Sequence, residues 1–176
     1  MPELAYDGPL EEMDAGAGYS VALLEHPTAR EAQALHHSGV KIGLIWSTFN
    51  SDPAVDAQQA YQQARTLGVT KETTIFAVVG DGTQETIHRY YSVWAGVVFG
   101  NGFTPGLCAG RDIIDSLIEP GYRGVWWQDN VGEVSPHASL YRVAGSTSEI
   151  VVPFPVWGPA TIPPPEPVRR AVRKRT

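Results

Sequence analysis

Short apolar segments that end in polar residues alternate with helical patterns along this chain, and this alternation limits the fold more than any other feature. The clearest segment is residues 74–79, TIFAVV, which is followed at once by Gly80, Asp81, Gly82 and Thr83. An apolar, β-branched run that ends in this way predicts a buried strand whose carboxyl end delivers Asp81 into a turn. In α/β enzymes, the carboxyl ends of neighbouring strands form the face that carries the chemistry.

The same pattern recurs through the chain. Strands are predicted at residues 4–7, 20–24, 40–46, 73–79, 106–109, 124–130, 139–143 and 149–152, and helices at residues 29–38, 53–67, 84–99 and 112–118. The second helix has the strongest signals, because Asp52 is a preferred N-cap, Pro53 suits the first helical position and Gly68 ends the pattern. Thr28 and Glu31 have the spacing of a capping box before the first helix.

Alternating strands and helices predict parallel strands joined by right-handed crossovers. We therefore expect a compact, closed (β/α)8 barrel of the TIM-barrel type, with some helices shortened because 176 residues are few for that fold. An open, doubly wound sheet is the alternative. The first predicted strand ends in Asp7, Gly8 and Pro9 and carries no G-x-G-x-x-G fingerprint, which argues against a nucleotide site.

The composition divides the chain into a barrel domain, residues 1–152, and a proline-rich arm, residues 153–176. The arm holds five of the 13 Lys and Arg residues near its tip, whereas the 19 Asp and Glu residues all lie at or before Glu166. Such an arm predicts polyproline-like structure and a partner, for example an acidic neighbour in an assembly. The acidic body argues against nucleic-acid binding by the folded domain.

Other classes of site have little support in the sequence. The single cysteine, Cys108, excludes an intrachain disulfide and a cysteine-based zinc site, and the five histidines show no H-E-x-x-H spacing. We expect no metal and no cofactor. No apolar run is long enough for a membrane span, and the first residues lack the features of a signal peptide.

Residues 56–69, DAQQAYQQARTLGV, followed by residues 73–78, TTIFAV, carry a resemblance to a known family. They are similar to the glycoside-hydrolase-like domain of unknown function that is common in actinobacteria and their phages, which is related to the family-25 glycoside hydrolases. Those are barrel lysozymes that cut peptidoglycan, so the resemblance implies a TIM-type barrel and a cell-wall glycan as ligand. Residues 105–110 match a further strand motif loosely, and residues 126–128, WWQ, match a late aromatic-Gln motif.

The family pattern places two acidic residues after the fourth strand, and this chain departs from it. The first acidic position falls on Val79 and the second on Asp81. Hydrolysis of a glycosidic bond requires a general acid together with a base, a nucleophile or a substrate group in that role. The candidate catalytic residues are Asp81 and Asp7, although Asp7 also suits a simple turn. Glu25 and Asp129 follow at further strand ends.

Aromatic residues near strand ends suit a sugar-binding mouth, since their flat faces stack on pyranose rings. Trp127 with Gln128, and Trp46, are the candidate substrate-binding residues. Core packing is the alternative for Trp46 and for Trp157. Trp126 and Trp127 are adjacent on one strand, so one ring should face into the barrel and the other outward.

Three functions follow from these observations. One is a barrel with impaired catalysis that binds wall glycan or has a structural role, and this interpretation rests on Val79. Another is an active peptidoglycan or polysaccharide hydrolase that uses Asp81 and Asp7. The third is an assembly role in a phage particle, in its tail or another surface part, which would bring the protein to the wall without a signal peptide. The first and third are compatible, and we favour them together.

Overall fold

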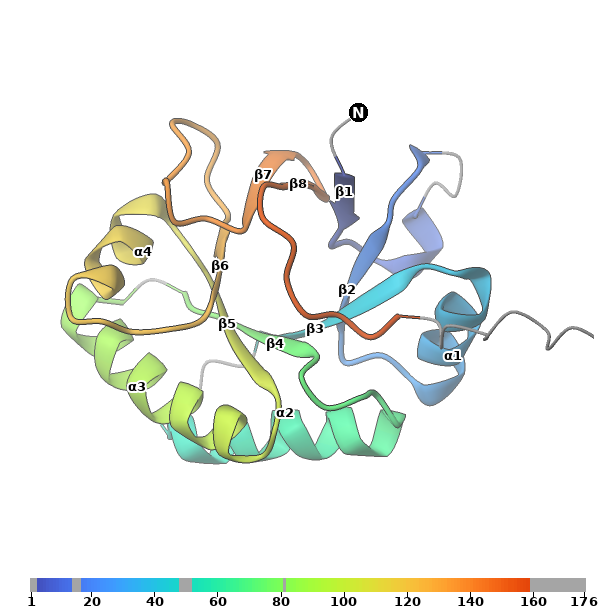
Figure 1. Cartoon of the computed structure of the whole chain (residues 1–176), viewed down its shortest axis with the longest axis horizontal. Coiled ribbons are helices and arrows are strands. Elements are labelled where there is room, and N and C mark those ends of the chain that lie inside the picture. The colour runs from blue at the N-terminus through green and yellow to red at the C-terminus, as the bar shows by residue number, and fades with distance from the viewer. Residues whose placement is uncertain (1–2, 14–16, 48–51, 81, 159–176) are drawn as a thin grey trace, which may run out of the picture.

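The computed structural model describes residues 3–13, 17–47, 52–80 and 82–158, and these form a closed barrel of eight strands (Figure 1). The strands are β1 (Glu3–Tyr6), β2 (Val21–Glu25), β3 (Lys41–Trp46), β4 (Thr74–Val78), β5 (Thr104–Ala109), β6 (Val125–Gln128), β7 (Leu140–Ala144) and β8 (Thr147–Ile150). Each strand pairs with the next one in the chain, and β8 closes the ring on β1. The predicted TIM-barrel-like fold is confirmed, and the open sheet is excluded.

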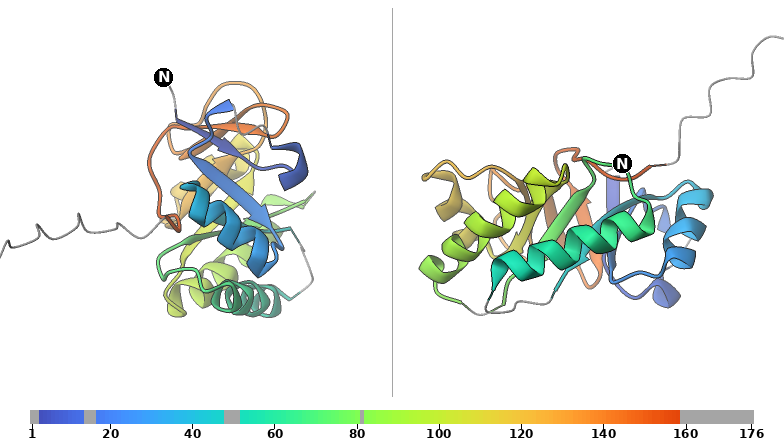
Figure 2. Two further views of the ribbon diagram at one scale, coloured as in Figure 1. Left: turned by 90° about the vertical axis from the view of Figure 1, so that its right-hand side faces the viewer. Right: turned by 90° about the horizontal axis from the view of Figure 1, so that it is seen from below.

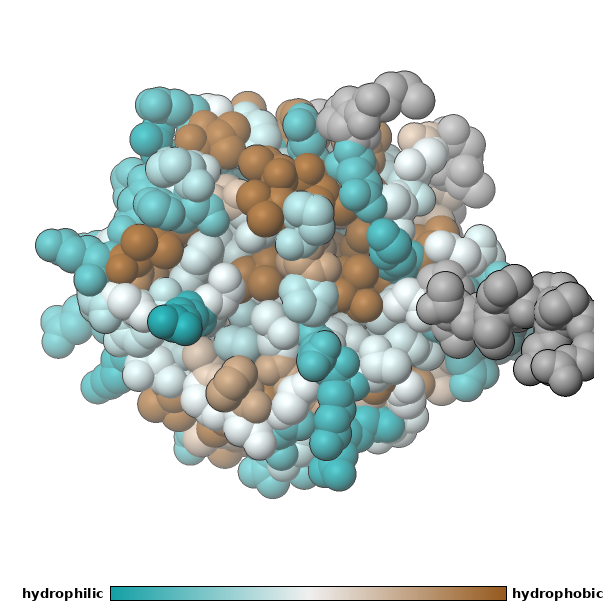
Figure 3. Space-filling view, in the orientation of Figure 1, coloured by the Kyte–Doolittle hydropathy of each residue, from teal (hydrophilic) through white to brown (hydrophobic). Residues whose placement is uncertain are grey.

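Helices cover only part of the barrel. They are a 3-10 turn, η1 (Leu10–Glu12), and four α-helices, α1 (Ala29–Ser38), α2 (Pro53–Leu67), α3 (Gln84–Gly100) and α4 (Arg111–Ile118). The α-helices follow β2, β3, β4 and β5, and α2 lies beside α3 (Figure 2). Within the described ranges, no α-helix covers β7, β8 or β1, and Figure 3 shows apolar residues at the surface over this part of the molecule.

The helix boundaries follow the predicted capping signals. Thr28 and Glu31 form a complete capping box, because each side chain bonds to the other residue's backbone N–H. Asp52 accepts hydrogen bonds from the first turn of α2, and Pro53 stands at the start of that helix. Gly68 adopts the left-handed conformation that ends α2 with φ of 74°. These helix positions are therefore determined locally.

The direction of the last strand differs from our prediction. β1 to β7 are parallel neighbours, but β8 runs antiparallel to both β7 and β1. The connection between β7 and β8 contains only Gly145 and Ser146, and Gly145 has φ of 51°. A parallel connection needs a dozen or more residues, so this short link permits only a hairpin.

Side chains on the two faces of the strands form separate cores. The outer core lies between the strands and the helices and includes Trp46, Ile75, Trp94 and Trp126. The inner core fills the barrel and consists of Ala5, Val21, Leu23, Ile45, Phe76, Cys108, Val125, Trp127 and Leu140. Gly106 is required here, because a Cβ at this position would overlap the ring of Phe76. The barrel interior is therefore a packed core and not a pore.

The start of the proline-rich arm packs against the amino end of the barrel. Trp157 forms an isolated antiparallel bridge with Ile42, through two backbone hydrogen bonds of 2.8 Å. The backbone N–H and the hydroxyl of Thr74 both donate to the carbonyl of Pro155. Phe154 lies edge-on to Phe76 and closes the inner core from below. Residues 159–176, including the predicted basic tip, lie outside the described residues.

Candidate active site

Four ionisable residues occupy inward-facing positions at the carboxyl ends of the strands. Successive residues of a strand alternate between its two faces. Asp7 therefore shares the face of Ala5, and Glu25 that of Leu23, both of which belong to the inner core. By the same alternation, Asp129 shares the face of Trp127 and Arg142 that of Leu140. The structure thus brings three of the predicted carboxylates, and one arginine that we did not predict, to the same end of the barrel.

Asp7 is a buried carboxylate with one cationic partner. Its side chain is 1% exposed, and its Oδ2 lies 2.7 Å from Nη2 of Arg142. Among the described residues, no group completes a well-aligned hydrogen bond to either carboxylate oxygen. Burial raises the pKa of the Asp7 carboxyl above its ordinary value, and the charge of Arg142 offsets part of this effect. Asp7 therefore has the environment of a group that can carry a proton.

Arg142 covers the floor of the barrel mouth. Its Nη1 donates to the carbonyl of Gly145 at 2.6 Å, which fixes the guanidinium against the β7–β8 hairpin. Its Cζ lies 5.2 Å from the ring centroid of Trp127, within cation–π range. Trp127 is 2% exposed and donates through Nε1 to Ser148. The indole is thus the floor below the Asp7–Arg142 ion pair, and it has no free face for a sugar in this arrangement.

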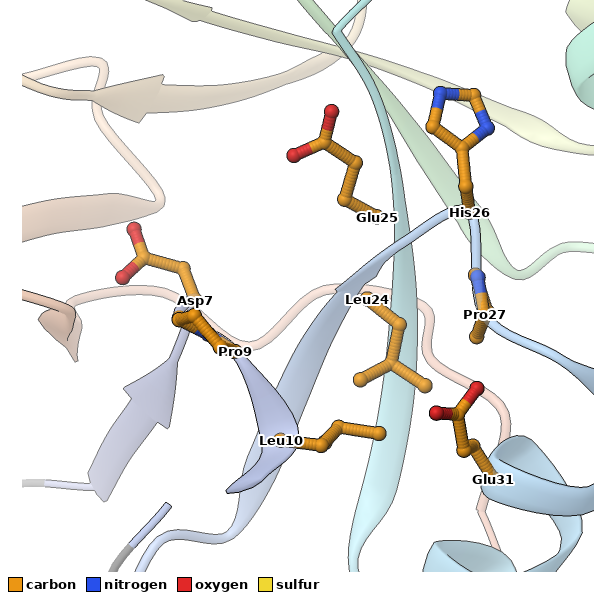
Figure 4. Close-up of a pocket in the computed structure, with 9 residues that line it drawn as sticks. Asp7, Pro9, Leu10, Leu24, Glu25, His26, Pro27 and Glu31 are labelled. Atoms are coloured by element: carbon orange, nitrogen blue, oxygen red, sulfur yellow. The ribbon is translucent and has the colours of Figure 1, made fainter. Parts of the chain in front are cut away.

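A pocket of about 400 Å³ opens beside Asp7, between the segments that follow β1 and β2 (Figure 4). Its charged residues are Asp7, Glu25 and Glu31, and its apolar walls come from Pro9, Leu10, Leu24 and Pro27. Glu25 is exposed and accepts a hydrogen bond from the hydroxyl of Ser47. In Figure 4 the carboxylates of Asp7 and Glu25 lie on the same side of the pocket.

The register of β1 and β2 relates the two carboxylates. Tyr6 is opposite Ala22, so Asp7 is level with Leu23, and Glu25 lies two residues farther along the neighbouring strand. Strand rise and spacing then place the Cα atoms of Asp7 and Glu25 about 8 Å apart. That spacing places the two carboxyl groups within reach of one sugar ring.

His26 follows Glu25 in an unusual conformation. Its φ is 44°, a value that residues other than glycine adopt rarely, and its ring meets Trp46 edge-on at 4.6 Å. His26 lines the pocket (Figure 4). A left-handed histidine beside a carboxylate is the kind of local strain that is often found at functional sites.

Asp129 and Cys108 lie on the opposite side of the mouth from the pocket strands. The backbone N–H of Asp129 donates to the carbonyl of Ala109, which extends the pairing of β6 with β5. Cys108 is buried and free. Burial, with the negative charge of Asp129, raises the pKa of the Cys108 thiol well above its ordinary value. This environment favours the protonated thiol over the thiolate, which is the nucleophilic form.

Asp81, the first predicted catalytic residue, lies outside the described residues, so its role remains a prediction. Val79, where the family pattern has an acidic residue, is buried in the outer core, and its N–H donates to the carbonyl of Cys108. The side chain of Val79 thus faces the helices. The inference of impaired catalysis from Val79 stays a prediction.

Two other predicted substrate-binding residues do not line the mouth. Trp46 is 8% exposed and belongs to the outer core, so stacking on a sugar would require it to leave that core. Gln128 is fully buried, and its amide bonds to the backbone of Asn130, Glu133 and Ser135. The side chain of Gln128 therefore holds the β6–β7 connection in place.

The remaining tryptophans are also core residues. Trp157 lies at the amino end of the barrel, stacked on His36 with ring centroids 4.1 Å apart. Trp126 faces outward and packs on Tyr91, while Trp127 faces inward, as the alternation predicted.

Sequence reasoning missed Arg142 and His26. Arg142 had a usable signal, because it stands two residues after Leu140 in a predicted strand and therefore on the same face. His26 had no such signal in the sequence, because its positive φ arises from the turn between β2 and α1. No group of three or more His, Cys, Asp or Glu side chains suited to a metal ion is found in the described part. No helix in this part has the length and apolar character to cross a bilayer.

Comparison with known proteins gives a family match and several structural likenesses. The family described as the Rv2525c-like, glycoside hydrolase-like domain matches residues 17–152. This range begins after β1, so Asp7 lies outside it. The search of curated proteins found no match.

Three solved structures resemble this one. The Tat-secreted protein Rv2525c of Mycobacterium tuberculosis, crystallised with HEPES, has a TM-score of 0.73 and 20% identity over 89% of this chain and 98% of that one. An uncharacterized protein of B. stearothermophilus has a TM-score of 0.64 and 16% identity over 84% and 95% of the two chains. The catalytic domain of endolysin ply40 from the Listeria monocytogenes bacteriophage P40 has a TM-score of 0.49 and 14% identity over 92% and 94%.

At such identities, the first two likenesses show a shared fold. Together with a family match over most of the chain, they agree with the closed barrel described above. The chain belongs to the Rv2525c-like, glycoside hydrolase-like domain family.

Proposed function

We propose that this protein is a glycan-directed barrel with restrained catalysis, which acts on cell walls as a binding or structural module. The observation that carries the proposal is the Asp7–Arg142 ion pair above Trp127. A carboxyl group acts as general acid only when its proton reaches the glycosidic oxygen. In the present geometry, Oδ2 of Asp7 lies 2.7 Å from Nη2 of Arg142, and protonation of Asp7 would give up the charge of this ion pair.

The second candidate is an active hydrolase, and a different observation favours it. Asp7 has a raised pKa because it is buried, whereas Glu25 is exposed on the neighbouring strand. Carboxyl groups in such different environments suit the roles of acid and base. Asp7 would protonate the leaving oxygen, and Glu25 would take a proton from the water that attacks the anomeric carbon. This reaction would require Arg142 to move away from Asp7. Asp81 would be the other candidate for the base.

One experiment separates the two candidates: release of reducing ends from purified actinobacterial cell wall, measured together with co-sedimentation on that wall. We expect sedimentation without release from the wild-type protein, and weaker sedimentation of Glu25→Gln. Release by the wild type that is lost in Asp7→Asn would instead support the hydrolase. Glu119→Gln, at the exposed end of α4, is the matched carboxylate control. Absence of both release and sedimentation would contradict both candidates.

The proposed location is a phage particle, where the barrel would be a tail or surface component and the arm would join it to other particle proteins. The basic residues of the arm motivate this part of the proposal. Deletion of residues 159–176 should leave the barrel folded and abolish incorporation into particles. Normal incorporation of the truncated protein, judged by mass spectrometry of purified particles, would count against it.

A further inference from the structure

Phe99 stands exposed at the amino end of the barrel, opposite the mouth. It is the penultimate residue of α3, and its side chain is 74% exposed. The ends of α2 and α3 and the starts of β5 and β6 line this region. An aromatic ring at this exposure contributes little to the fold. It is therefore available for contact with another molecule.

Two hollows adjoin the ring of Phe99. The first has a volume of about 430 Å³ and mainly apolar walls, which include Ala95, Pro105 and Val125, with Arg123 at its side. This volume accommodates one or two large apolar side chains. The backbone of Arg123 is held by the hydroxyl of Tyr91, which donates to its carbonyl at 3.1 Å. The wall of the hollow is therefore built on the rigid outer core.

The second hollow lies on the other side of Phe99, has a volume of about 540 Å³, and is cationic. Arg65 and Lys71 line it, together with the turn that contains Gly102. Gly102 has φ of 86°, and the aliphatic stem of Lys71 lies close to the place that a Cβ on Gly102 would take. No carboxylate is among the described residues that line either hollow.

The charged residues that line the two hollows beside Phe99 are all cations. Arg65, Lys71 and Arg123 are exposed and take part in no ion pair with another described residue. Elsewhere in the described residues, Lys41, Arg111 and Arg142 each pair with a carboxylate, whereas Arg30 and Arg89 are exposed and, like the three cations here, take part in no such pair. Three unpaired cations on an acidic body attract an acidic segment to this location.

We propose that the Phe99 face, defined as Phe99 with Arg65, Lys71 and Arg123, docks an acidic peptide segment of a partner protein. One large apolar side chain of the segment would fill the first hollow against Phe99, and neighbouring carboxylates would meet the cations. This combination of an apolar anchor and a charged rim is common in peptide recognition. A long polyanion fits less well, because three cations give weak attraction and the surrounding acidic surface repels it.

The position of the face allows it to work independently of the mouth. Thr104 starts β5 beside the apolar hollow, and its N–H donates to the carbonyl of Thr73. The next residue, Thr74, bonds to Pro155, so the face adjoins the segment that closes the barrel. A partner bound here would leave the pocket of Asp7 and Glu25 open at the opposite end.

The test is selection of a displayed library of random 12-residue peptides against the full-length protein, followed by affinity measurement of the enriched peptides. We expect peptides with several acidic residues around one aromatic or large aliphatic residue. Phe99→Ala should weaken their binding about tenfold or more. The double variant Arg65→Glu with Lys71→Glu should abolish it. The control is Val131→Ala, which removes an exposed apolar side chain, 66% exposed, from the β6–β7 connection.

Circular dichroism of each variant would show that the fold is retained, as the exposure of Phe99 leads us to expect. Several results would overturn the proposal: enrichment of neutral or basic peptides, no enriched peptide at all, or acidic peptides that bind Phe99→Ala as tightly as the wild type. Binding of heparin at this face in place of any peptide would also refute it.

Discussion

Removal of the indole of Trp157 should destabilise the whole barrel, although the residue stands at the edge of the described chain. Trp157 is 8% exposed, its ring stacks on His36 at an interplanar angle of 8°, and its backbone bonds to Ile42 in both directions. Residues 153–158 thus form the lower closure of the barrel. Trp157→Ala removes the largest side chain of that closure.

The size of the effect follows from burial. A buried tryptophan hides about 200 Å², and at about 25 cal/mol per Å² this amounts to about 5 kcal/mol. The measured loss should be smaller, because residues 153–158 can detach locally while the barrel stays folded. We expect a loss of about 3 kcal/mol in the free energy of unfolding. For a chain of this size, that corresponds to a decrease in Tm of about 6–12 °C.

Urea denaturation followed by far-UV circular dichroism would measure this loss without relying on tryptophan fluorescence. Phe99→Ala is the matched control, because its ring is 74% exposed, and its stability should stay close to that of the wild type. A protein that ends at residue 152 should be destabilised at least as much as Trp157→Ala. If either the truncated protein or Trp157→Ala unfolds at the wild-type urea concentration, the segment is not part of the barrel's cooperative unit.

Substitutions at three further sites, each with its own comparison, test other parts of the structure. Asp7→Asn should be more stable than the wild type at pH 7 and equal to it well below pH 3.8, the ordinary pKa of aspartate. Burial raises the pKa of Asp7 in the folded state, so the wild type loses stability as the pH rises through this raised folded-state pKa. Urea titrations from pH 3 to 7 would reveal the opposite trend if Arg142 dominated. Gly124→Ala should destabilise the protein strongly, because the new Cβ would overlap the Tyr91 hydroxyl. Gly96→Ala, at an uncrowded position on α3, should stabilise the protein by about 1 kcal/mol. Equal melting temperatures for the two variants would refute this reasoning. Thr28→Ala should cost about 1 kcal/mol by breaking the capping box of α1, with a smaller loss for Thr28→Ser in the same thermal melts.

Local signals in the sequence predicted much of the fold. The N-caps Thr28 and Asp52 and the C-terminal glycines fixed the helix ends, because they act through bonds to the adjacent turn. The reversal of β8 was missed, although the distance between the last two predicted strands was already too short for a crossover. Strand pattern alone reports which side chains share a face, and it says nothing about strand direction.

The site was less predictable, for two physical reasons. Barrel strands are apolar on both faces, so the sequence of β3 does not reveal that Trp46 faces the helices while Ile45 faces inward. The partnership of Asp7 with Arg142 joins the two ends of the barrel sequence, and no local pattern encodes such a pair. Asp7, Glu25 and Asp129 could be named as candidates because each stands at or near the carboxyl end of a predicted strand.

The antiparallel last strand also determines at which end of the barrel the chain leaves the domain. In a fully parallel barrel, the chain leaves the final strand at the same end as the catalytic loops. Here β8 carries the chain back, and the segment that follows is anchored beside Ile42 and Thr74 at the opposite end. A scaffold attached through the downstream residues would therefore hold the domain at its amino end. The pocket of Asp7 and Glu25 would then face away from the point of attachment.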